Sequence, residues 1–165
     1  GVGPVGQMNA GVFFPVEFIQ RPEQMTILFE AMQQVRRVFL DGRSHPAPDD
    51  LEKTWMGHSI GRWEGDTLVV ESRNFKDDAA FRIDGDENMH LTERFTRVGP
   101  ETLKYEVTVD DPTVYAKPWT ATLFMKKETK DQIYEFACHE GNIAMGGILR
   151  GARMEEKAAE KKGSN

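Results

Sequence analysis

The chain has 165 residues, of which 27 are acidic and 21 are basic, so its formal net charge is −6. A chain of this length is expected to fold as one domain, and it needs neither disulfide bonds nor metals to do so. A membrane-spanning helix needs a run of about 18 apolar residues, and the sequence contains no such run. The acidic balance and the scattered basic residues argue against a nucleic-acid partner.

The chain opens with a glycine-rich stretch, and we interpret residues 1–11 as a loose lead-in. Beyond it, apolar and polar residues alternate with a period of two, which is typical of half-buried strands. This pattern predicts nine strands, at Val12–Ile19, Met25–Ala31, Gln34–Leu40, Thr54–Arg62, Thr67–Asn74, His90–Val98, Leu103–Asp110, Pro118–Lys127 and Gln132–His139. Short turns between them, such as Glu64-Gly65-Asp66, predict an antiparallel meander.

Two longer irregular stretches, Ser44–Lys53 and Lys76–Asn88, interrupt the meander. Long loops on a strand scaffold are where binding residues tend to lie. From about Gly147 to Lys162, alanine and long straight-chain residues predict a helix. We therefore divide the chain into the lead-in, a β domain over residues 12–145, and a C-terminal helix and tail over residues 146–165.

Nine short strands leave exposed edges unless the sheet closes on itself. The predicted fold is therefore all-β: an antiparallel meander closed into a lipocalin-like β-barrel with a C-terminal α-helix. A two-sheet sandwich is the main alternative. A barrel of about eight strands can hold one small ligand, so an internal pocket is the expected site.

His58 is the leading candidate for chemistry. Strand alternation places it on one face with Met56, Ile60 and Arg62. If Glu64-Gly65 is a two-residue turn, His58 lies opposite Glu71, which would raise the histidine pKa and orient its ring for general acid or base catalysis. The alternative is a histidine hydrogen-bonded between large side chains in the barrel wall.

Glu93 shares a face with Leu91 and Phe95 and is predicted to point inward. An inward carboxyl with a raised pKa would suit proton transfer. The alternative is a structural ion pair with an arginine such as Arg62. His90 falls on the opposite, polar face, where we expect it to be exposed.

Other candidates are weaker. Asp110 and Asp111 could bind a hard cation but more readily cap a turn. Tyr115 and Trp119 could line a pocket mouth, although packing is favoured. Cys138 precedes a histidine whose side chain points to the opposite face, so the two do not form a nucleophile–base pair. A lone cysteine and widely spaced histidines predict neither a disulfide bond nor a metal site.

Several segments resemble one family. They are Leu40–Pro46, Thr54–Val70, His90–Phe95, Val107–Pro112, Lys117–Thr120 and Cys138–Asn142. Together they are similar to a large family of bacterial secreted proteins of unassigned function, over about Val16 to Lys157. The resemblance implies a β-rich fold and a periplasmic or secreted location. Family members are longer and carry an export signal, so we expect this chain to be the core of a longer exported protein.

Three functions follow as hypotheses. The slightly favoured one is a cofactor-independent isomerase, lyase or cyclase that acts on a small, largely apolar substrate inside the barrel. In it, His58 and Glu93 transfer protons and Arg62 stabilises negative charge. The others are a carrier of a small hydrophobic ligand and a structural or interaction module, and a homo-oligomer is possible. The expected ligand-binding residues are Trp55, Met56, Ile60, Glu71, Tyr105, Tyr115 and Trp119.

Overall fold

The computed structural model describes residues 3–5, 8, 14–76, 88–137 and 144–163, with the side chains of residue 48 and residues 158–163 left aside. The chain divides into two units, Gly1–Glu135 and Phe136–Asn165, and each is described by itself. The first unit contains all the strands, and the second contains one helix.

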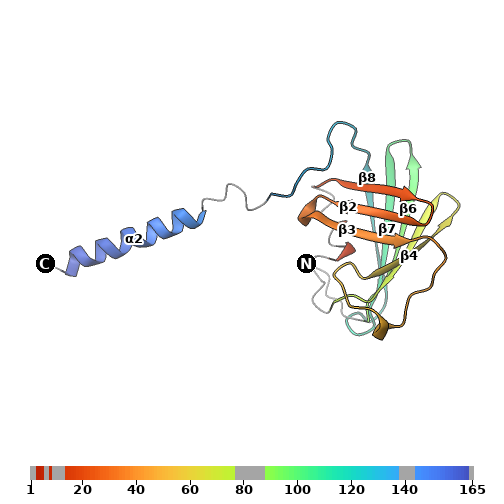
Figure 1. The fold of residues 1–165 in the computed structure, drawn as a ribbon, viewed down its shortest axis with the longest axis horizontal. Coiled ribbons are helices and arrows are strands. Elements are labelled where there is room, and N and C mark those ends of the chain that lie inside the picture. Colours follow the sequence, from red (N-terminus) through yellow and green to blue (C-terminus); the bar gives the residue numbers. More distant parts are fainter. Residues whose placement is uncertain (1–2, 6–7, 9–13, 77–87, 138–143, 164–165) are drawn as a thin grey trace. The chain divides into compact units, whose positions relative to one another are not determined.

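Eight strands form a single sheet in chain order (Figure 1). They are β1 (Val16–Arg21), β2 (Gln24–Phe29), β3 (Gln34–Phe39), β4 (His58–Glu64), β5 (Thr67–Arg73), β6 (His90–Gly99), β7 (Thr102–Asp110) and β8 (Trp119–Lys126). Two 3₁₀ turns, η1 (Ala31–Gln33) and η2 (Pro48–Asp50), lie in the connections around β3. Eight of the nine predicted strands thus have an observed counterpart.

Neighbouring strands pair antiparallel, as predicted, except at one place. β3 and β4 are parallel, through Val38 opposite Ser59 and Phe39 opposite Ile60. The long connection from Leu40 to Gly57 allows this crossover, which a tight turn cannot provide. The alternation of strand direction in the meander is therefore interrupted once, between β3 and β4, which run in the same direction.

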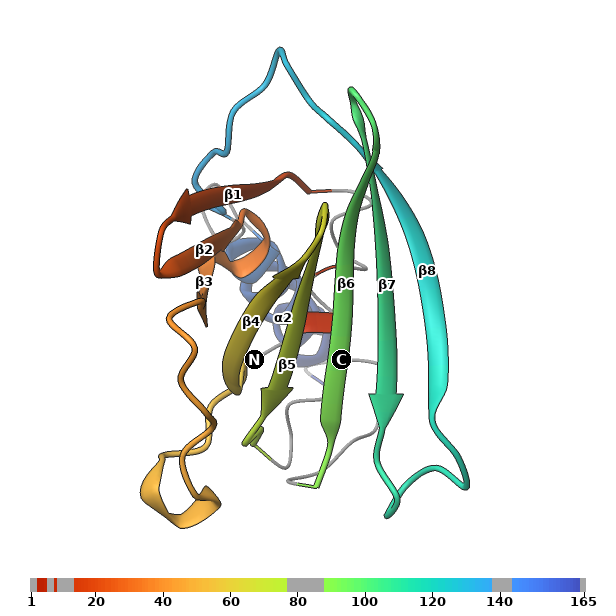
Figure 2. The same cartoon turned by 90° about the vertical axis from the view of Figure 1, so that its right-hand side faces the viewer.

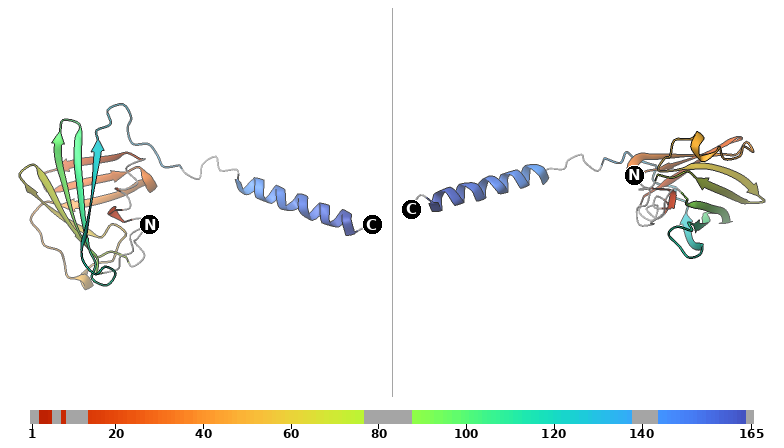
Figure 3. Two further views of the ribbon diagram at one scale, coloured as in Figure 1. Left: turned by 180° about the vertical axis from the view of Figure 1, so that it is seen from behind. Right: turned by 90° about the horizontal axis from the view of Figure 1, so that it is seen from below.

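The sheet curls into a half-barrel that is open, not closed. Figures 2 and 3 show β1–β3, in orange, and β4–β8, in yellow to cyan, as two walls of one curled sheet. Within the described residues, β1 pairs only with β2 and β8 only with β7. The prediction that the sheet closes into a barrel is therefore wrong. The expected ninth strand does not join the sheet, because residues 132–137 belong to no strand and residues 138–139 lie outside the described part of the chain.

The hydrophobic core lies on the inner side of the curl, which we call the concave face. Alternation places every second residue there, including Met25, Ile27 and Phe29 of β2. Met8, from the predicted lead-in, is also fully buried in this core. The opposite side of the sheet, which we call the convex face, carries the intervening polar residues.

Two glycines fit the sheet around β4. A Cβ on Gly61 would lie 2.8 Å from Val38 Cγ1 and 2.9 Å from Leu40 Cδ2, so only glycine lets these strands approach. Gly57 has φ +64°, and a Cβ there would lie 2.5 Å from the carbonyl oxygen of Arg73. Both glycines therefore fix the position of β4 against its neighbours.

The second unit contains α2 (Ala144–Gly163), in agreement with the predicted C-terminal helix. Its described apolar side chains Met145, Ile148 and Leu149 are exposed. Within the described residues, no helix is long and apolar enough to cross a membrane.

Candidate functional site

A buried network of polar side chains joins five strands on the concave face. Arg36, from β3, donates from Nη1 to Glu93 Oε1 over 3.0 Å, and its Nη2 pairs with Glu93 Oε2. The same guanidinium donates to the hydroxyls of Ser59 over 3.1 Å and Ser72 over 2.7 Å. Tyr105 donates its hydroxyl proton to Glu93 Oε1 over 2.9 Å. This arrangement gives each carboxylate oxygen a charged donor.

The network is sealed from solvent. The side chains of Arg36 and Glu93 are 1% and 0% exposed. Burial, followed by the negative field of Glu93, raises the pKa of Tyr105 well above its ordinary value, so the phenol stays protonated and remains a donor. A bidentate, fully bonded ion pair in such a place has no free group to offer a ligand. We therefore assign this cluster to the architecture of the sheet.

The ion-pair partner that the sequence suggested for Glu93, Arg62, is wrong, because Glu93 pairs with Arg36. Arg62 does not pair with Glu93, because Arg62 lies on the convex face and is 56% exposed. There it pairs with Glu64 over 2.9 Å and with Glu71 over 2.5 Å. The structural alternative for Glu93, a buried ion pair, is the arrangement observed, with Arg36 as its cation.

His58 and Glu93 lie on opposite faces of the sheet. Glu93 lies opposite Val70 on β5, and Val70 lies opposite Gly61 on β4, so these three residues are on the concave face. Ser59 is two residues before Gly61 on the same strand and is therefore on the concave face as well. His58 precedes Ser59 and therefore points to the convex face. The two side chains cannot exchange a proton, because the sheet separates them.

The predicted pairing of His58 with Glu71 is also corrected. The hairpin between β4 and β5 turns at Gly65-Asp66, one residue later than expected, with Glu64 opposite Thr67. Gly65 has the positive φ, +59°, that this turn requires. The shift places Ile60 opposite Glu71 and His58 opposite Arg73.

This register creates a row of ionisable side chains across four strands of the convex face. His58 on β4 is opposite Arg73 on β5, and His90 on β6 is opposite Asp110 on β7. Ser72 pairs with Leu91, so the same register continues with Arg73 beside His90. With strands spaced about 4.8 Å apart, the row is about 14 Å long. We call His58, Arg73, His90 and Asp110 the convex row.

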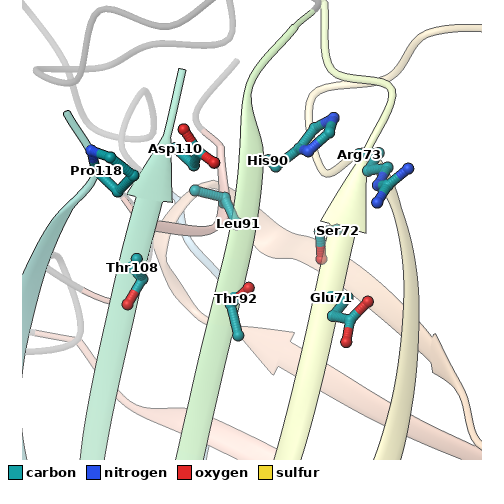
Figure 4. Close-up of a pocket in the computed structure, with 9 residues that line it drawn as sticks. All are labelled: Glu71, Ser72, Arg73, His90, Leu91, Thr92, Thr108, Asp110 and Pro118. Carbon is teal, nitrogen blue, oxygen red and sulfur yellow. The ribbon is translucent and has the colours of Figure 1, made fainter. Parts of the chain in front are cut away.

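A hollow of about 190 Å³ lies over the part of this row between β5 and β8 (Figure 4). Ionisable side chains from β5, β6 and β7 border it, and threonine hydroxyls from β6 and β7 line it. Its lining residues are Glu71, Ser72, Arg73, His90, Leu91, Thr92, Thr108, Asp110 and Pro118. Ser72 and Leu91 have their side chains on the concave face, so they contribute backbone to the hollow.

His45 extends the row at its β4 end. Its Nδ1 lies 2.9 Å from His58 Nδ1, and the ring of His58 stacks on Phe39 at a centroid distance of 5.4 Å. Burial and then the nearby His58 and Arg73 lower the pKa of His45 to about 4. Burial and then Arg43 lower the pKa of His58 as well. Both rings are therefore neutral at pH 7, and one proton can bridge their Nδ1 atoms.

Arg73 is the cation that sets the field of the hollow. Among the residues that the structure describes, no carboxylate lies within ion-pair distance of Arg73, although Glu71 is two residues away. Glu71 is held by Arg62 instead. Burial, followed by the field of Arg73, lowers the pKa of His90, against the opposing effect of Asp110 and Asp111. Among the described residues, a positive charge without a carboxylate partner thus borders the hollow beside a neutral imidazole.

The remaining predicted binding residues are divided among different places. Trp55 and Met56 pack partly buried against the core, and Ile60 lies half-buried on the convex face. Tyr115 and Trp119 form an edge-to-face pair with ring centroids 5.9 Å apart, also beside the core. Of the predicted set, Tyr105 alone contacts Glu93, and Glu71 alone lines the hollow.

Sequence reasoning did not select Arg36, Arg73 and His45, and it placed His90 on the exposed polar face without assigning it a role. The position of His90 on that face is confirmed. Strand alternation places Arg36 on the same buried face as Val38, so its inward direction could have been predicted from the sequence. The convex row had no local signal, because it depends on the register of four strands.

Within the described part of the chain, no cluster of three or more histidine, cysteine, aspartate or glutamate side chains is arranged to hold a metal ion. Comparisons with protein-family models, with curated proteins and with solved structures found no match. The function is therefore argued from the geometry of the two polar clusters.

Proposed function

We propose that this protein binds a small organic carboxylate in the convex hollow and does not act as an enzyme through His58 and Glu93. Arg73 carries the proposal: it is an exposed cation at the edge of a hollow, and no described carboxylate neutralises it. A charged hydrogen bond from a guanidinium to a carboxylate is among the stronger polar contacts, and its planar fork favours two-point binding.

The other side chains around the hollow limit the class of ligand further. Thr92 and Thr108 offer hydroxyls between Arg73 and Asp110, and Asp110 can accept a hydrogen bond at the far end. The favoured ligand therefore has a carboxylate for Arg73 and a hydroxyl or amino donor for Asp110. The volume of about 190 Å³ suits a molecule of a few carbon atoms.

A binding function is preferred to the isomerase, lyase or cyclase activity that the sequence slightly favoured, but its proposed ligand is a polar carboxylate and not the small hydrophobic ligand of the carrier hypothesis. That activity relied on proton transfer between His58 and Glu93, which lie on opposite faces. It also relied on a largely apolar internal pocket, whereas the convex hollow is polar. A periplasmic or secreted location stays a prediction from the family resemblance.

The test is calorimetric titration of the whole chain with short mono- and dicarboxylates, with and without a hydroxyl or amino group, and with inorganic phosphate as a second anion. We expect millimolar or tighter binding of the substituted carboxylates. Arg73→Gln should weaken this binding at least tenfold. The matched control is Arg94→Gln, because Arg94 is on the same face but is paired with Glu64 outside the hollow.

The pH dependence sharpens the test. A bound carboxylate beside His90 favours the imidazolium, so affinity should rise as the pH falls below about 6.5, the ordinary histidine pKa. His90→Gln should remove this rise. Equal binding by wild type and Arg73→Gln, or no carboxylate binding by wild type at millimolar concentrations, would exclude the proposal. Tighter binding of phosphate than of every carboxylate would exclude the ligand class.

A further inference from the structure

The open edge of β8 is another feature that lacks a partner among the described residues. Within the described residues, β8 pairs on one side only, with β7. Its concave-face residues Trp119, Ala121, Leu123 and Met125 are only partly buried, although three of the four residues opposite them on β7, Tyr105, Val107 and Val109, are almost fully buried. An edge strand with apolar residues on one face is a template for another strand.

The segment Gln132–Ala137 has the pattern of such a strand. It contains Ile133 and the aromatic residues Tyr134 and Phe136, which are residue types that favour strands, and none of its residues is assigned to a strand in the described part of the structure. Tyr134 is 59% exposed. A large aromatic residue in this setting loses the burial that a sheet position would provide.

The segment also fits the β8 edge in register. A hairpin-like pairing with Lys127 opposite Gln132 leaves Glu128–Asp131 as the connecting loop. In that register Tyr134 lies opposite Met125 and Phe136 opposite Leu123, so both aromatic residues join the concave face. Phe124, which is 67% exposed, then lies opposite Glu135 on the convex face. A shift by one residue would reverse all of these faces.

Within the first unit, the part of the segment that includes Tyr134 is held away from the β8 edge of its own chain. The backbone N–H of Tyr134 donates to Glu30 Oε2 over 2.9 Å, and Glu30 follows β2, on the wall opposite β8. Figure 2 shows the chain leaving β8 and passing over to the side of β1 and β2. Within the described residues, each copy therefore has both an unpaired β8 edge and a segment whose Tyr134 is directed to Glu30 instead.

We propose that Gln132–Ala137 of a second copy of this chain adds to β8 as a ninth, antiparallel strand, and that the exchange is reciprocal. Each copy donates one strand and accepts one, so a closed twofold dimer satisfies both edges at once. The exchange covers Leu123 and Met125 and extends the half-barrel. It uses the same register that a hairpin would use, with the loop Glu128–Asp131 opened as the hinge.

The test uses cysteine pairs in full-length protein with Cys138→Ser. One copy carries Phe124→Cys and the other carries Glu135→Cys, and the two are mixed, refolded together and oxidised. These positions face each other in the proposed register, so we expect a disulfide-linked heterodimer in high yield. The control pair, Thr122→Cys with Ile133→Cys, lies on the same face but four residues out of register, and its yield should be at least tenfold lower.

Two further measurements complete the test. Wild-type protein should sediment as a dimer at micromolar to millimolar concentrations, and Tyr134→Pro, which removes an N–H from the added strand, should sediment as a monomer that keeps the far-UV spectrum of a folded β protein. A chain carrying both Phe124→Cys and Glu135→Cys that forms its disulfide within a monomer would overturn the proposal in favour of a hairpin in one chain. A monomeric wild type with no cross-link in any pair would overturn it entirely.

Discussion

The two faces of the sheet treat their charges in opposite ways. On the concave face, Arg36 and Glu93 are buried, bidentate and surrounded by hydroxyl donors and acceptors. On the convex face, Arg73 has no described carboxylate partner, and three histidines beside it have lowered pKa values. A buried charge must be fully paired, whereas a charge near solvent can remain available. The comparison explains why the conspicuous polar cluster is structural and the dispersed one is the candidate site.

The largest effect should come from breaking the concave ion pair. Glu93→Gln leaves Arg36 as a buried cation without its counter-charge, which should lower the free energy of unfolding by about 3–5 kcal/mol. Urea denaturation of wild type and variant measures this. The combined variant Arg36→Met, Glu93→Leu, Tyr105→Phe should lose much less, because no buried charge remains. A triple variant as unstable as Glu93→Gln would mean that the ion pair itself is strongly stabilising.

A smaller loss should follow from removing one neutral donor in the same network. Tyr105→Phe deletes the hydroxyl that donates to Glu93 Oε1, while Arg36 still donates to that oxygen. We expect a loss of about 1–2 kcal/mol in the same urea experiment. Tyr134→Phe is the matched control because its ring is exposed, and it should change stability by less than about 0.5 kcal/mol.

On the convex face the effect should appear as a pH dependence of stability. His45 has a folded pKa of about 4, below its unfolded value near 6.5. Between these values the unfolded state binds the proton and the folded state does not, so the free energy of unfolding falls as the pH drops from about 6.5 to 4. His45→Gln should flatten this slope. An unchanged slope in that variant would assign the dependence to other groups.

The smallest effect should come from the exposed ion pairs of the convex face. Arg62→Gln removes the bonds to Glu64 and Glu71, which solvent and salt already screen. The expected loss in the free energy of unfolding is the smallest of the series, and it decreases further in high salt. A loss comparable to that of Glu93→Gln would remove the proposed contrast between the faces.

Local sequence was sufficient to predict the eight observed strands and the faces of their side chains, although it also predicted a ninth strand that does not join the sheet. The alternation around Glu93 correctly placed it inward, and the alternation around His90 correctly placed it outward, because a strand projects successive side chains to opposite sides. The glycine in Glu64-Gly65-Asp66 correctly predicted a hairpin, but not which two residues form its turn. The shift of the turn by one residue decided whether His58 lies opposite Glu71 or opposite Arg73.

The partners of these side chains could not be predicted locally. Arg36 and Glu93 come from strands β3 and β6, and they meet only because the sheet curls. The parallel step between β3 and β4 and the open edge of β8 depend on where long connections return. The entropy of closing a long connection changes only slowly with its length, so the number of residues in a connection carries little information about where the chain returns.

The sequence by itself thus determined a strand-rich domain with a C-terminal helix, and which side chains share a face. The tertiary structure alone decided that the barrel is open, that Glu93 pairs with Arg36, and that Arg73 stands beside His90 without a carboxylate partner in the described residues. The face of the sheet to which a side chain points is fixed by the two-residue period of its own strand. Partnership is fixed by register and curvature across many strands, which are properties of the folded sheet.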